Sequence, residues 1–136
     1  MLKNVSSQSM RFPGKLHALL LGLALVPPAA LGSETLPIEW GDSHRFESER
    51  RLTSGQVLRV CGPLQKGQAV HWTFHADAVL AFDIHHLVGK RVHYGEKRLR
   101  TKGLQGRFVA PETVAYCWRW TNRSAAPVRM AFMLRH

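Results

Sequence analysis

Residues 114–122 read VAYCWRWTN, and this stretch decides the fold class. Its aromatic side chains occupy every second position, at Tyr116, Trp118 and Trp120, and smaller or polar side chains stand between them. Successive side chains of a β-strand point to opposite faces, so the three aromatic residues share one face. We expect that face to lie in the core of a β-protein, with Cys117 on the outward face.

A second stretch, residues 56–61 (QVLRVC), alternates in the same way and ends with Cys61 on its outward face. The chain has two cysteines, and we predict a structural disulfide between Cys61 and Cys117 that joins neighbouring strands of one sheet. This register places Val60 beside Trp118 in the interior. A bridge across more than 50 residues could contribute about 4 kcal/mol in the chain-entropy model.

Short alternating runs fill the rest of the chain between Gly, Pro and Asn residues, and no long stretch has helical periodicity. We therefore expect an all-β fold, a small antiparallel β-sandwich of the jelly-roll type that occupies residues 45–136 as one domain. The expected strands cover residues 45–52, 56–61, 69–75, 79–87, 90–94, 104–109, 114–122 and 128–135.

The N-terminal residues have the pattern of a secretory leader. Basic residues precede an apolar run at 17–26, and small residues follow at 30–32. We predict a signal peptide over residues 1–32 and an extended N-terminal arm over residues 33–44. The apolar run is about half of the roughly 20 residues that a membrane span requires, so we expect a secreted or periplasmic protein without a transmembrane span after cleavage.

The charge of the chain favours anionic partners. Removing residues 1–32 takes away three of the 19 Lys and Arg and none of the nine Asp and Glu, so the net charge falls from +10 to +7. In an exported protein such a charge suits an anionic protein, lipid head group or glycan, and we expect no nucleic acid partner.

The basic residues are concentrated in residues 90–107 (KRVHYGEKRLRTKGLQGR), where Glu96 is the single acid. We predict that this stretch binds the partner, although a solvated basic loop is the plainer alternative. Its seven basic residues are Lys90, Arg91, Lys97, Arg98, Arg100, Lys102 and Arg107.

Residues 70–87 (VHWTFHADAVLAFDIHHL) suggest a hairpin that turns at residues 76–78 and pairs Phe74 with Leu80. That hairpin would place His71 opposite Asp83 on the outer face. Imidazole and carboxylate groups suit Cu or Zn, so a candidate metal site follows, although exposed histidines without any cofactor are the plainer alternative. Its candidate ligands are His71, His75, Asp83 and His85.

The run 116–122 and the strand expected after it resemble the closing strands of the Golgi-dynamics (GOLD) domain. Residues 56–60, 70–74 and 82–84 are similar to earlier strands of that domain, so the resemblance covers about residues 45–135. It implies a β-sandwich that acts as a binding or adaptor module, as in secretory cargo receptors and lipid-transfer proteins. The cargo-receptor type carries a disulfide whose later cysteine corresponds to Arg119 here, two residues beyond Cys117.

The motifs of common enzyme classes are absent from the sequence. It contains no G-x-S-x-G elbow, no H-E-x-x-H helix, no glycine-rich phosphate loop and no Cys-x-x-Cys pair. We therefore expect an exported, non-catalytic binding or adaptor domain that recognises an acidic partner through its basic edge. The alternative is a periplasmic Cu- or Zn-binding protein that uses the histidine cluster.

Overall fold

The computed structural model describes residue 14 and residues 32–136, which form seven β-strands. The predicted signal peptide lies almost wholly outside these described residues. Within them, no helix is long and apolar enough to cross a membrane. The strands are β1 (Ser33–Pro37), β2 (Arg45–Leu52), β3 (Val57–Leu64), β4 (Ala69–Val88), β5 (Arg91–Val109), β6 (Val114–Thr121) and β7 (Val128–Arg135).

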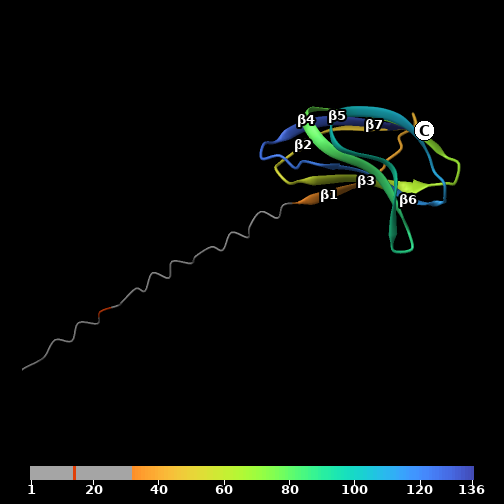
Figure 1. Ribbon diagram of the computed structural model, residues 1–136, viewed down its shortest axis with the longest axis horizontal. Coiled ribbons are helices and arrows are strands. Elements are labelled where there is room, and N and C mark those ends of the chain that lie inside the picture. Colours follow the sequence, from red (N-terminus) through yellow and green to blue (C-terminus); the bar gives the residue numbers. More distant parts are fainter. Residues whose placement is uncertain (1–13, 15–31) are drawn as a thin grey trace, which may run out of the picture.

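The strands form a β-sandwich with one disulfide, which confirms the predicted fold class (Figure 1). The first layer consists of β1, β3, β6, the second half of β4 and the first half of β5. The second layer consists of β2, β7, the first half of β4 and the second half of β5. Hydrogen bonding continues from one layer to the other because β4 and β5 pass through both.

The β3–β6 pair has the register that the side-chain alternation predicted. Val60 lies opposite Trp118 on the core face, and Cys61 lies opposite Cys117 on the outer face. The predicted disulfide is confirmed, and it joins cysteines separated by 56 positions in the chain. It ties two strands that are already paired, on the face away from the core.

The hairpin predicted within residues 70–87 is wrong, because residues 69–88 form the single strand β4. Phe74 pairs with Phe132 of β7 and Leu104 of β5, and not with Leu80. The chain bends without reversing, and the β4–β5 register shifts between His75 and Leu80. At the bend Asp77 accepts a hydrogen bond from a β7 backbone amide, so a polar residue that resembled a turn signal instead holds β4 against a neighbouring strand.

The two strands predicted at 90–94 and 104–109 are likewise parts of the single strand β5. Gly95 and Gly103, which lie between the two predicted strands, are inside it. A Cβ atom on Gly95 would lie 2.4 Å from the Phe108 ring, so this glycine permits a close approach between two distant parts of the strand.

The segment expected to be an extended N-terminal arm contributes β1 to the first layer. Residues Ser33–Pro37 pair in parallel with β3, and the Ile38 amide then donates to the Cys61 carbonyl. Residues 33–37 are therefore part of the sandwich.

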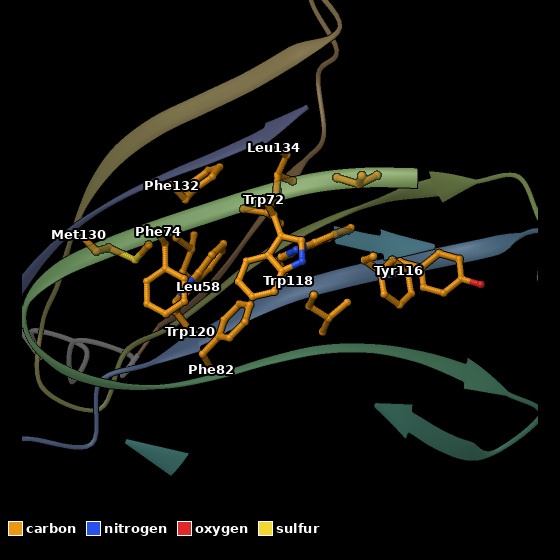
Figure 2. Packing of buried hydrophobic residues seen from close by; sticks show 14 of the residues in the cluster. Leu58, Trp72, Phe74, Phe82, Tyr116, Trp118, Trp120, Met130, Phe132 and Leu134 are labelled. Carbon is orange, nitrogen blue, oxygen red and sulfur yellow. The ribbon is translucent and has the colours of Figure 1, made fainter. Parts of the chain in front are cut away.

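Aromatic residues from both layers meet in the core (Figure 2). Trp120 of the first layer stacks on Phe132 of the second, with ring centroids 5.1 Å apart. Trp118 and Tyr116 of the same strand are completely buried, as the alternation in residues 114–122 predicted. Burial of each such side chain contributes on the order of 2–3 kcal/mol, so these rows hold the two layers together.

Candidate functional site

The strand β5 forms a free edge of both layers. Among the described residues it pairs only with β4, along nearly its whole length. The opposite edge of a β-strand in this position leaves backbone N–H and C=O groups without partners in the sheet. Such an edge can accept an additional strand from another molecule.

All seven basic residues of the predicted binding stretch are exposed on this edge or in the turn before it. One of them, Arg98, forms an ion pair with Glu96. The other six form no ion pair within residues 32–136. The β5 edge therefore carries a strong excess of uncompensated positive charge.

The tip of the β4–β5 hairpin, residues 87–92, extends beyond the rest of the sandwich, below the label of β6 in Figure 1. Leu87 and Val88, just before the turn, are 56% and 39% exposed, and Val92, just after it, is 47% exposed. Lys90 and Arg91 occupy the turn and the start of β5. This hairpin tip combines apolar side chains with positive charge, a feature that we did not predict.

The base of the hairpin is fastened to β6 by a charged network on the outer face of the first layer. The Asp83 carboxylate accepts hydrogen bonds from Arg119, at 2.8 Å from Nε and 2.7 Å from a terminal nitrogen. Its other oxygen lies 2.7 Å from His85 Nδ1. Asp83 is 7% exposed, so burial of this carboxylate is matched by partners on both sides.

A pair of histidines lies on the inner side of the same hairpin. The His86 ring stacks on His93 and also contacts Tyr116, with centroids 5.4 Å and 4.8 Å away. Burial lowers the pKa of His86, the neighbouring His93 lowers it further, Glu112 opposes this shift, and His85 adds a smaller decrease. His86 is thus held in its neutral form near neutral pH.

The predicted metal ligands are not brought together, because the hairpin that would have joined them does not form. His71 and His75 lie on the first half of β4 in the second layer, whereas Asp83 and His85 lie on its second half in the first layer. His71 faces Arg107 and Arg135 rather than Asp83. Within residues 32–136, no three His, Cys, Asp or Glu side chains converge as a metal site would require.

The arrangement on the β4–β5 edge suits binding of an acidic chain. Exposed guanidinium and ammonium groups can pair with carboxylates, the free strand edge can pair with an extended backbone, and the hairpin tip offers an apolar contact. The ion pair between Asp83 and Arg119, with His85 on the other carboxylate oxygen, links the base of the hairpin to β6.

No protein-family profile matches the chain. No curated protein matches it either. Solved structures do match, among them PliG of Aeromonas hydrophila, a periplasmic lysozyme inhibitor of g-type lysozyme, with a TM-score of 0.56 and 12% identity over 76% of this chain and 96% of that one.

Two further solved structures are similar. The pre-peptidase C-terminal domain of a Bacillus anthracis collagenase has a TM-score of 0.53 and 8% identity, over 76% of this chain and 95% of that one. The Yersinia pseudotuberculosis-derived mitogen has a TM-score of 0.53 and 10% identity, over 67% of this chain and 84% of that one. At such low identities the similarity shows the small all-β fold and nothing about activity. None of these three is a GOLD domain.

Proposed function

We propose that this protein is an exported, non-catalytic binding module that recognises an acidic protein through the β5 edge and the hairpin tip. The observation that carries the proposal is the free edge itself. It presents seven basic residues, all exposed, against Glu96 alone. Positive charge on this scale attracts acidic partners and speeds their association.

Two features support export. The N-terminal sequence has the pattern of a signal peptide, and the disulfide between Cys61 and Cys117 is of a kind that persists in oxidising compartments. The fold is also one that a periplasmic protein, PliG, uses to bind another protein. The GOLD resemblance points in the same direction, toward a binding or adaptor module.

A protein partner accounts for more of the surface than a lipid head group or a glycan would. Positive charge alone would be sufficient to bind a phosphate or sulfate group. The β5 edge, however, also has backbone groups that are unpaired in the sheet, and the hairpin tip has exposed Leu87, Val88 and Val92. An acidic protein can use all three, because it supplies carboxylates, an extended backbone and apolar side chains together.

The test compares the protein with a charge-reversed variant, Arg100→Glu with Lys102→Glu. Both side chains are exposed and neither is engaged in an ion pair in the described structure, so the fold should be unaffected. Each protein is immobilised, exposed to envelope extract and eluted with a salt gradient. Arg123→Glu with Arg135→Glu, at two exposed residues outside β5, reverses the same number of charges and is the matched control for net charge.

We expect the wild-type protein and the Arg123→Glu, Arg135→Glu control to retain the same acidic protein and release it as salt rises, and we expect the Arg100→Glu, Lys102→Glu variant to lose it. Titration with purified g-type lysozyme, followed by its lytic rate, tests one defined partner. Anionic phospholipid vesicles and heparin are tested in parallel. Capture that does not depend on salt, or binding confined to vesicles or heparin, would overturn the proposal.

A further inference from the structure

The outer face of the second layer contains a groove of about 580 Å³ that lies across three adjacent strands, β2, β7 and β4. Its volume is within the range of small-ligand sites. The groove belongs to neither the β5 edge nor the charged network of the first layer. Its outward-facing lining residues are Glu49, Arg51, His75, Asp77, Arg129 and Ala131.

The floor of the groove is low because Ala131 occupies the central strand. Ala131 lies directly between Glu49 of β2 and His75 of β4, whose longer side chains form walls on either side. An alanine flanked by two longer side chains leaves a hollow on the face of a sheet. The hollow is therefore set by the sequence of β7 at one position.

One end of the groove is strongly cationic. Arg51 and Arg129 are direct cross-strand partners on the same face, and both are exposed. Like charges that face each other across strands destabilise a sheet unless an opposite charge lies between them. Asp77 lies nearby, but one of its oxygens already accepts the Arg129 backbone amide at 2.9 Å.

In two other cross-strand arginine pairs within the described part of the chain, a carboxylate offsets the repulsion between the facing guanidinium groups. Arg119, which faces Arg59, is paired with a carboxylate, and so is Arg45, which faces Arg135. In the pair formed by Arg51 and Arg129, neither guanidinium forms an ion pair within residues 32–136. This pair is thus the one whose charge is left for a ligand.

We infer that this groove binds a small ligand through an oxyanion group, which the guanidinium groups of Arg51 and Arg129 hold between them while the rest of the ligand lies over Ala131. Guanidinium groups bind carboxylate, phosphate and sulfate oxygens with paired hydrogen bonds. The inference is independent of the proposed function, because it uses a different face and other residues.

The test titrates the protein separately with inorganic phosphate, sulfate and glucuronate at constant ionic strength, and follows backbone amide NMR shifts. We expect saturable shifts at Arg51, Arg129 and Ala131. The preferred anion then distinguishes a tetrahedral phosphate or sulfate group from the carboxylate of a sugar acid. An absence of saturable binding for all three anions would overturn the inference.

Variants separate a built site from general charge attraction. Arg51→Ala and Arg129→Ala should each weaken binding by about tenfold or more, since each removes a charge-assisted contact. The matched control is Arg135→Ala on the same strand and face, which should change affinity by less than about twofold. Ala131→Leu keeps every charge but fills the floor, and it should also block binding. An equal loss in Arg135→Ala, or unchanged binding in Ala131→Leu, would contradict the inference.

Discussion

The β3–β6 pair keeps one register over eight residue pairs, whereas the β4–β5 pair runs about twice as far and changes register at three places. The first pair lies within one layer and is crossed by the disulfide. The second pair passes from one layer to the other and ends in the protruding hairpin. A ladder within one layer needs only regular alternation, but a ladder that turns the corner of a sandwich needs bulges and small residues.

The largest effect on the free energy of unfolding is expected from removing the disulfide that crosses the β3–β6 pair. The Cys61→Ala, Cys117→Ala double variant removes a bridge across 56 positions, and the chain-entropy model gives a loss of about 4 kcal/mol in the free energy of unfolding. Equilibrium urea denaturation measures it. Because both cysteines lie on the outer face, the β-sheet circular dichroism of the folded variant should match that of the wild type. A change below about 1 kcal/mol would show that the ladder alone holds this region.

A smaller effect is expected from a single methyl group in the β4–β5 pair. Gly95→Ala would place a Cβ atom 2.4 Å from the buried Phe108 ring, so we expect a loss of about 1–3 kcal/mol from overpacking. Chemical denaturation measures the loss, and Phe108→Leu in the same background should restore part of it.

The matched control for this substitution lies in the other pair. Gly62→Ala on β3 would bring a Cβ atom to 3.1 Å from the Ile38 side chain, a contact that a small shift can relieve. Its cost should therefore be clearly lower than that of Gly95→Ala. Equal costs at the two positions would remove the contrast between the regular and the bent pair.

The smallest effect concerns pH at the base of the hairpin. The pKa of His86 is lowered in the folded protein, chiefly by burial and then by His93. The unfolded chain therefore binds more protons than the folded one between the lowered pKa and the ordinary value near 6.5. Stability should fall as the pH drops through this window and be fully present above it.

Urea denaturation between pH 5 and pH 8 measures this dependence, and His86→Phe should reduce its slope. The pKa of His136 is also lowered, by burial and by His44, so His136→Gln should remove a separate part of the same slope. An unchanged slope in His86→Phe would show that the hairpin base does not sense pH.

Much of the framework could be predicted from the residues. The alternation of aromatic and polar side chains in residues 114–122 was enough to predict which face of β6 enters the core. The matching alternation before Cys61 was enough to predict the register of β3 with β6 and the disulfide. These predictions succeeded because the period of a strand is local and a one-residue slip would bury every polar side chain.

The errors concern positions where a local turn signal competed with a long-range contact. Residues 76–78 and Gly95 look like breaks, yet Asp77 binds a β7 amide and Gly95 makes room for Phe108. The four predicted metal ligands lie apart for the same reason, because their proximity depended on a reversal of the chain at residues 76–78. The side-chain alternation did not predict the hairpin tip or the groove on the second layer, since the exposure of one strand depends on which other strands lie beside it.

By itself, then, the order of side chains determined the strand character of most segments, the faces that enter the core and the partner of each cysteine. These properties follow from stereochemistry that repeats every two residues. The tertiary structure decided that β4 and β5 each continue through both layers, that β5 is left at the edge, and that Arg51 and Arg129 face each other without a carboxylate between them. Those outcomes depend on contacts between segments far apart in the chain, and no local period encodes them.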